Sequence, residues 1–217
     1  MNRFSTTALA AALFPAFLSA QPPALTAPAL AARVDKHYNQ LHSLKAGFTE
    51  SYDGLGISRS ESGTLLLVKP GRMKWEYSSP TGKLFLIDGS FAWFYTPGDA
   101  QVQRQHAKQL DDMRSPLNFL LGRTRLEKEL DNLTVAPAPH GEFSLTGVPR
   151  GMEKRLSRVA LAVTADGAIT AMEIDETDDA VTRFTFSDEE LNPEFPPGTF
   201  RFDPPTGVPI VDVPPPV

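Results

Sequence analysis

Apolar residues that recur every three or four positions mark one amphipathic helix near the N-terminus. Leu30, Val34 and Tyr38 follow this spacing and form a single apolar stripe. Pro28 suits the first turn, because the first residues of a helix have no intrahelical partner for a backbone N–H. The pattern predicts a helix from Leu30 to about Leu44.

Short strands separated by turn residues follow this helix. The stretch "RMKWEY" (72–77) alternates, with Met73, Trp75 and Tyr77 on one face, and "GTLLLVKP" (63–70) is a buried strand. Further strands are predicted at 142–147, 156–164, 168–175, 181–186, 200–203 and 210–213. A meander of this kind favours an antiparallel barrel or sandwich.

The stretch "LFLIDGSFAWFY" (84–95) predicts a hairpin around the turn Asp88-Gly89-Ser90, but its strands are apolar on both faces. A sheet with one face in water should instead alternate apolar and polar residues. One explanation is protein on both sides, a helix on one face and a second sheet on the other. The other explanation is a cavity for an apolar ligand on one face. The pattern leaves both open.

A second helix is predicted at 116–121, with Ser115 as N-cap, Pro116 in the first turn and Gly122 as the stop. It is apolar nearly all round, so it must be covered on both faces. A large curved sheet encloses more space than its own side chains fill. We therefore expect this short helix to act as a lid over a hollow. Residues 125–132 predict one more helical turn.

The usual signatures of catalysis and metal binding are missing from the sequence. There is no Gly-rich phosphate loop and no nucleophile elbow. His37 and His42 are five positions apart, which keeps them off a common helical face. The acidic stretches Asp111-Asp112 and 176–179 are typical of solvated turns. The sequence thus predicts neither an enzyme nor a cofactor.

The N-terminus has the pattern of a secretory signal peptide. Arg3 precedes an apolar run over 9–18, and Leu18-Ser19-Ala20 is a small-residue cleavage site. A membrane anchor is the alternative, but the run is short and Pro15 interrupts it. We expect residues 1–20 to be a signal peptide and residues 21–217 to form a single exported domain.

Composition narrows the class of protein further. The 217 residues are 41% hydrophobic and contain no Cys, which excludes disulfides, thiolate sites and a lipid-modified N-terminal Cys. The net charge of −5 argues against nucleic acid as the main ligand.

Several stretches, taken in order, resemble one known family. They are "HSLKAGFTESY", "GTLLLVKPGRMKWEYSSP", "LFLIDGSFAWFYTP", "SPLNFLLG" and "FRFDPPTGV". This set resembles the periplasmic outer-membrane lipoprotein carriers, the LolA family, over nearly all of the exported chain. The resemblance implies a mainly β (α+β) fold, an incomplete antiparallel β-barrel with a helical lid over a hydrophobic cavity.

The resemblance also implies a function. A family member takes the acyl chains of a lipoprotein released by an inner-membrane ABC transporter and carries them across the periplasm to an outer-membrane receptor. It is a monomer that makes no bond and needs no cofactor. The alternatives are a module that senses lipids or lipoproteins, and a carrier of another amphiphile such as a glycolipid.

The resemblance and the apolar pattern together give candidate site residues. The family's basic residue before the strand-ending Pro corresponds to Lys69, and Arg72 is a second candidate for this contact with the lid. The candidate cavity residues are Phe48, Leu66, Val68, Trp75, Phe85, Ile87, Trp93, Leu117, Phe119 and Leu120.

Overall fold

The structure is a computed structural model that describes residues 25–108 and 125–213. The predicted signal peptide (1–20) and the predicted short helix (116–121) lie outside the described residues. Within them, no helix is long and apolar enough to cross a membrane.

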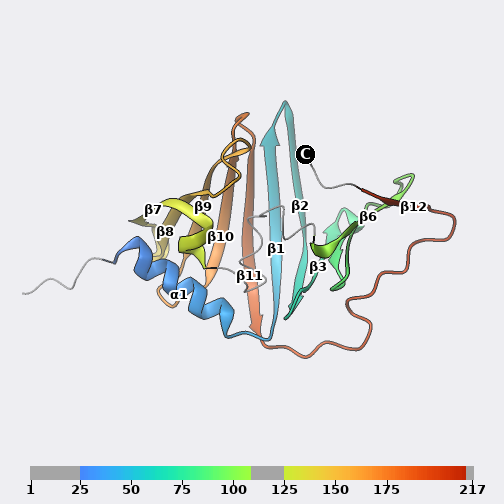
Figure 1. Ribbon diagram of the computed structural model, residues 1–217, viewed down its shortest axis with the longest axis horizontal. Coiled ribbons are helices and arrows are strands. Elements are labelled where there is room, and N and C mark those ends of the chain that lie inside the picture. Colours follow the sequence, from blue (N-terminus) through green and yellow to red (C-terminus); the bar gives the residue numbers. More distant parts are fainter. Residues whose placement is uncertain (1–24, 109–124, 214–217) are drawn as a thin grey trace, which may run out of the picture.

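In the described ranges, twelve strands form a single curved sheet. Figure 1 shows this sheet with helix α1 (Ala27–Asn39) beside it. Its strand order is β12-β6-β5-β4-β3-β2-β1-β11-β10-β9-β8-β7. All neighbours are antiparallel except β12 and β6, which are parallel. The strands are β1 (Ser43–Gly54), β2 (Ile57–Val68), β3 (Arg72–Ser79), β4 (Thr81–Ile87), β5 (Phe91–Tyr95), β6 (Val102–His106), β7 (Leu130–Pro137), β8 (Phe143–Pro149), β9 (Leu156–Val163), β10 (Ile169–Glu176), β11 (Val181–Leu191) and β12 (Ile210–Asp212).

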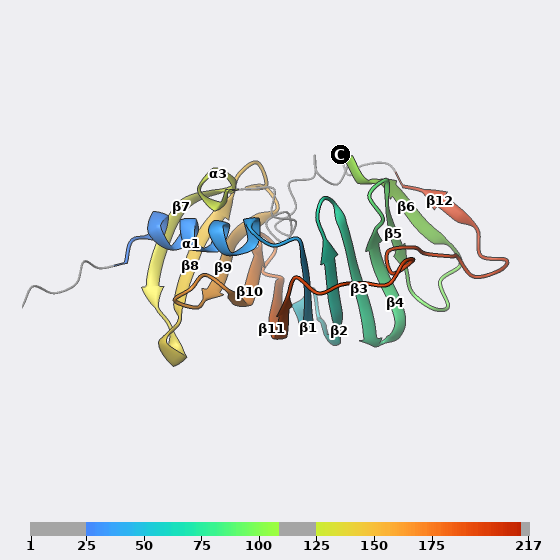
Figure 2. The same cartoon turned by 90° about the horizontal axis from the view of Figure 1, so that it is seen from below.

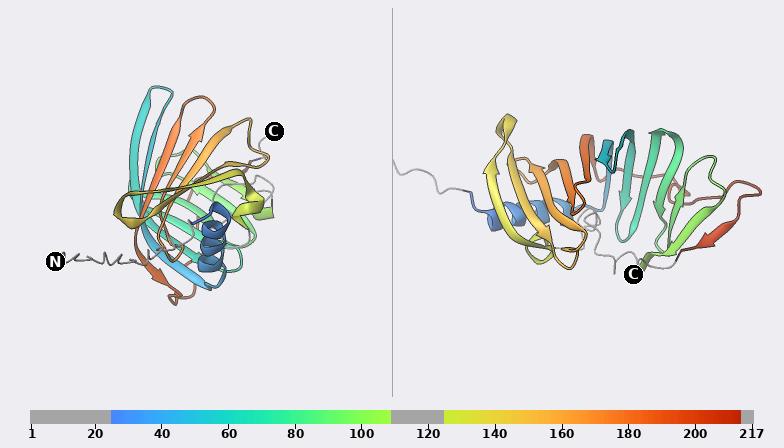
Figure 3. Two further views of the ribbon diagram at one scale, coloured as in Figure 1. Left: turned by 90° about the vertical axis from the view of Figure 1, so that its left-hand side faces the viewer. Right: turned by 90° about the horizontal axis from the view of Figure 1, so that it is seen from above.

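The sheet curves but does not close, because β7 and β12 stand at its two ends in the described part of the chain. Figure 3 shows the helix α1 (Ala27–Asn39) on the concave side of the curved sheet. The predicted fold class, an incomplete antiparallel barrel, is confirmed.

Helix α1 begins at Ala27, three residues before the predicted start at Leu30. The Thr26 hydroxyl accepts a hydrogen bond from the Ala29 backbone N–H (3.3 Å), and Pro28 lies in the first turn. The helix ends at Asn39, so its predicted extension to Leu44 is wrong. Leu44 is instead a residue of β1, where it pairs with Leu67 of β2. A three-residue apolar spacing fits the end of a helix and the start of a buried strand equally well.

The hairpin predicted at 84–95 is confirmed as β4 and β5. The Asp88 carboxylate fixes its turn, because Oδ1 accepts hydrogen bonds from the backbone N–H groups of Ser90 and Phe91, both at 2.7 Å. Phe85 pairs with Phe94 across the hairpin, and Leu86 pairs with Trp93. These two pairs point to opposite faces of the sheet.

The helical turn predicted within residues 125–132 forms, but it covers only the first part of this stretch. The helix α3 (Leu126–Glu129) is a single turn, and Leu130 already begins β7, which pairs with β8. The 3₁₀ helix η2 (Pro139–Gly141) connects these two strands. Helix α3 packs beside α1, where Asp35 accepts a hydrogen bond from the Leu126 backbone N–H (3.1 Å).

Residues 192–209, here called the C-terminal strap, connect β11 to β12. The prediction of a strand at 200–203 is wrong, because these residues of the strap do not form a strand. Figure 2 follows the strap from β11 past β3, β4 and β5 to β12. The Phe202 ring lies 5.9 Å from the rings of both Trp93 and Tyr95, and the Arg72 guanidinium lies 5.5 Å from the Phe200 ring. The strap therefore covers the convex face of the hairpin.

Candidate functional site

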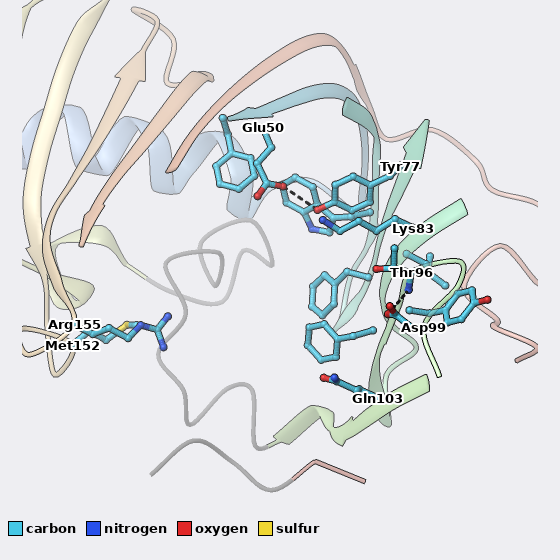
Figure 4. Close-up of a pocket in the computed structure, with 14 residues that line it drawn as sticks. Glu50, Tyr77, Lys83, Thr96, Asp99, Gln103, Met152 and Arg155 are labelled. Carbon is cyan, nitrogen blue, oxygen red and sulfur yellow. Dashed lines mark hydrogen bonds between the residues drawn. The ribbon is translucent and has the colours of Figure 1, made fainter. Parts of the chain in front are cut away.

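A cavity of about 520 Å³ opens on the concave face of the sheet (Figure 4). Pockets of about 300–1,000 Å³ are typical for small ligands. Half of its lining residues come from β3, β4 and β5, and the β8–β9 connection contributes two. The lining residues are Glu50, Trp75, Tyr77, Lys83, Leu84, Phe85, Phe94, Tyr95, Thr96, Asp99, Gln103, Met152, Arg155 and Phe184.

The main wall of this cavity is aromatic. The rings of Phe85 and Phe94 lie 4.8 Å apart, and the rings of Trp75 and Phe184 lie 5.5 Å apart in an edge-on arrangement. Phe94 remains 37% exposed, although it is a large apolar residue. The alternation of the strands places these four side chains on one face, where Trp75 and Phe184 are buried and Phe94 is exposed. Such a wall can take an apolar chain by burial alone.

A network of charged side chains borders the aromatic wall. The Tyr77 hydroxyl donates a hydrogen bond to the Glu50 carboxylate (3.0 Å), and the Arg59 guanidinium lies 3.9 Å from the same carboxylate. Arg59 also lies 4.0 Å from Glu61, which forms an ion pair with Lys83. Buried charges are costly unless they are paired, and here each charge has a partner.

The phenol of Tyr77 stays protonated within this network. Burial, followed by the charge of Glu50, raises the pKa of Tyr77 above its ordinary value of 10.0. The phenol can therefore serve as a permanent donor to the Glu50 carboxylate. The Lys83 ammonium lies 4.3 Å above the Tyr77 ring, which gives it a second favourable contact.

Met152 and Arg155 lie across the cavity from the aromatic wall (Figure 4). They belong to the connection between β8 and β9, whose backbone is fixed at both ends. The Arg155 N–H donates to the Met152 carbonyl (2.9 Å), and the Arg155 carbonyl accepts from the Thr177 N–H (3.0 Å). The Arg155 side chain is exposed and extends toward the cavity.

The structure brings some of the predicted cavity residues together. Trp75 and Phe85 line the cavity. Phe48 lies directly behind them in the core, with its ring 4.7 Å from Trp75. Ile87 shares the face of Phe85, two residues further along β4, and is also part of the core.

Leu66, Val68 and Trp93 lie on the other face of the sheet. Leu66 pairs with Lys74, Val68 with Arg72, and Trp93 with Leu86. Successive strand residues point to opposite faces, so the neighbours of inward side chains point outward. A continuous apolar run does not tell which of its two faces turns inward. Leu117, Phe119 and Leu120 lie outside the described residues.

The two candidate basic residues have different partners. The Lys69 ammonium donates a hydrogen bond to the Tyr38 carbonyl at the last turn of α1. Burial lowers the pKa of Lys69. Arg72 stacks on Phe200 of the C-terminal strap instead. Both residues line a second cavity of about 660 Å³ beside the strap.

Sequence reasoning missed several lining residues. Tyr77 alternates with Trp75 along β3 and so lies on the same face, and Phe94 shares the face of Phe85 because the two residues pair across the hairpin. Phe184 belongs to the strand predicted at 181–186, which is far in sequence from the other residues of the aromatic wall. Arg155 carries no local signal, because only the fold places the β8–β9 connection opposite the hairpin. Among the described residues, no cluster of His, Asp or Glu could hold a metal ion.

Comparisons with known proteins give a consistent result. The family model described as "Outer membrane lipoprotein carrier protein LolA" matches residues 39–203. A protein of Nitrosospira multiformis, called an outer-membrane lipoprotein carrier protein, is 32% identical over 71% of this chain and 74% of its own. A protein of Chromobacterium violaceum with the same name is 29% identical over 92% of this chain and 97% of its own.

Similarity to solved structures supports the fold. An uncharacterized conserved protein from Thermus thermophilus superimposes with a TM-score of 0.53 at 14% identity, over 85% of this chain and 97% of its own. At this level of identity the likeness concerns the fold alone.

Proposed function

Because the chain belongs to the LolA family of outer membrane lipoprotein carrier proteins, we propose that it carries the acyl chains of lipoproteins in its concave cavity. The observation that carries this proposal is the partly exposed aromatic wall around Trp75, Phe85 and Phe94. Acyl chains cannot stay in water, since each buried CH₂ contributes about 0.8 kcal/mol. A wall without directional anchors lets burial drive capture.

The proposed route begins at the inner membrane and ends at the outer membrane. A lipoprotein-releasing ABC transporter loads the carrier, which crosses the periplasm and delivers its cargo to an outer-membrane receptor. The protein acts after removal of the signal peptide over 1–20, as a single domain over 21–217. It works as a chaperone and not as an enzyme, because binding and release change no covalent bond.

The basic residue that the family resemblance assigns to the lid corresponds to Lys69 in this proposal. Its ammonium already contacts α1 through the Tyr38 carbonyl, whereas Arg72 faces the C-terminal strap. Among the predicted cavity residues, Trp75 and Phe85 contact the acyl chains directly. Phe94 and Phe184 join them as contacts that the structure adds.

Tryptophan fluorescence can test this proposal, because the chain has two Trp residues and each lies on a different face. In a Trp93→Phe background the emission reports on Trp75 alone. Titration with a synthetic triacylated peptide should change this emission and saturate. No change at concentrations that saturate an established carrier would contradict acyl-chain binding.

A matched pair of variants locates the binding site. Phe94→Ala should weaken binding of the triacylated peptide about tenfold, because it removes a ring that the acyl chain would cover. The control is Val211→Ala on β12, where the side chain is 38% exposed, against 37% for Phe94. Equal affinities of the two variants would place the site elsewhere.

A further inference from the structure

Some of the charged groups that line the concave cavity have hydrogen-bond or ion-pair partners among the described residues, and one does not. Glu50 accepts from Tyr77, Lys83 pairs with Glu61, and the Asp99 carboxylate accepts from the Thr96 backbone N–H (3.1 Å). The Arg155 guanidinium has no hydrogen bond or ion pair with any residue that the structure describes. Among the described residues that line the cavity, the Arg155 guanidinium is therefore the charged group left without a protein partner and available to a ligand.

The position of Arg155 suits recognition of a ligand's polar end. The aromatic wall lies on one side of the cavity and Arg155 on the opposite side, so one amphiphile can touch both (Figure 4). Backbone hydrogen bonds to Met152 and Thr177 fix the loop that carries the guanidinium. A guanidinium offers several donors in a planar fork, which matches the oxygens of a phosphate or a carboxylate.

We propose that Arg155 makes the cavity selective for amphiphiles with an anionic head, a phosphate or a carboxylate, while the aromatic wall holds the apolar tail. This inference rests on the proposed acyl-chain binding and adds a preference for the head. General attraction of anions does not account for it, since the chain as a whole has a net charge of −5. Arg155 would act as a specificity-determining residue.

Three amphiphiles with the same tail test the preference. Dodecyl phosphate, dodecanoate and dodecyl maltoside are titrated below their micelle-forming concentrations, with Trp75 emission in the Trp93→Phe background as the readout. We expect the two anionic amphiphiles to bind about tenfold more tightly than the maltoside. Arg155→Gln should remove this difference.

Two further variants separate the fork from the charge. Lys154→Gln removes the same charge from the neighbouring exposed residue, which does not line the cavity, and should keep the preference. Arg155→Lys keeps the positive charge but lacks the planar fork, so it should retain only part of the preference for anionic heads. Loss of the preference in Lys154→Gln would show general electrostatics and overturn the inference.

The remaining outcomes are distinct. If all three amphiphiles bind the wild-type protein equally, the inference fails and the proposed function stands. If none binds, the proposed function fails as well. The last experiment is a competition with inorganic phosphate. If inorganic phosphate displaces dodecyl phosphate at equal concentration, the guanidinium binds free phosphate. The aromatic wall then adds nothing to the binding, and the inference is overturned.

Discussion

The two halves of the sheet solve the burial of apolar surface in different ways. On the half from β7 to β11, helix α1 fills the concave face, and Leu30 and Val34 are buried in the same core as Leu161 and Val163. The convex face of that half is polar, with Arg158 paired to Asp175 (2.7 Å). On the other half, the hairpin of β4 and β5 is apolar on both faces.

The C-terminal strap explains this difference. The strap covers the convex face of β3, β4 and β5 and buries apolar side chains of these strands. Leu86 is fully buried there. The concave face of the same strands does not need to be filled completely. A partly exposed aromatic wall can then remain available to a ligand without loss of the fold. Stability and binding thus use opposite faces of the same strands.

The largest expected effect comes from the half that α1 fills. Leu161→Ala should lower the free energy of unfolding by about 2–5 kcal/mol, because the side chain is 1% exposed and its removal leaves a cavity. Phe94→Ala should cost about 1 kcal/mol or less, since the ring is already partly in solvent. Denaturant unfolding of both variants checks this contrast. Equal losses would mean that the two halves are packed alike.

A smaller effect should follow from weakening the strap. Phe202→Ala removes the ring that contacts Trp93 and Tyr95, and we expect a loss of about 1–2 kcal/mol in the free energy of unfolding. Binding of the triacylated peptide should not change, because Phe202 lies on the convex side. In a Trp75→Phe background Trp93 is the only Trp, and its emission reports release of the strap. Weaker peptide binding by the fully folded variant would refute the separation of the two faces.

The sequence predicted the elements better than their surroundings. The hairpin around Asp88 and the N-terminus of α1 follow from local turn and capping chemistry, and the apolar runs identified the strands that are buried on both faces. Which face turns inward depends on long-range packing, so Leu66 and Leu65 could not be told apart. Neither could local patterns show that Phe200 and Phe202, in a Pro-rich segment, cover a hairpin more than 100 residues away.

The candidate site was predictable only in part for the same reason. Trp75 and Phe85 stood out because they lie in strands with strong periodicity. Phe184 and Arg155 come from strands and loops that reach the cavity only after the sheet has curved. The position of β7 was missed because Leu126, Leu130 and Leu133 have a helical spacing, whereas pairing with β8 decides their conformation.

The smallest expected effect concerns the end of the strap, where β12 is clamped to β6. Arg104 donates two hydrogen bonds to the Asp212 carboxylate (2.7 and 3.0 Å), and these hydrogen bonds hold the pKa of Asp212 below its ordinary value of 3.8. A lowered pKa means that the folded state binds the proton less tightly than the unfolded state. The pair therefore stabilises the fold at pH values above 3.8. This contribution is lost as the pH falls through the pKa of Asp212 in the folded state.

Asp212→Asn should accordingly lower the denaturant midpoint slightly at neutral pH, and its difference from the wild type should vanish in acid. The control is Asp203→Asn, which breaks an exposed ion pair with Arg201 inside the strap and leaves the clamp on β6 intact. This control should match the wild type at every pH. A difference between Asp212→Asn and the wild type that persists in acid would show that the carboxylate's charge is not what holds β12. The end of the strap would then be held by its backbone pairing with β6 and by its aromatic contacts, which makes Phe202 the side chain to test next.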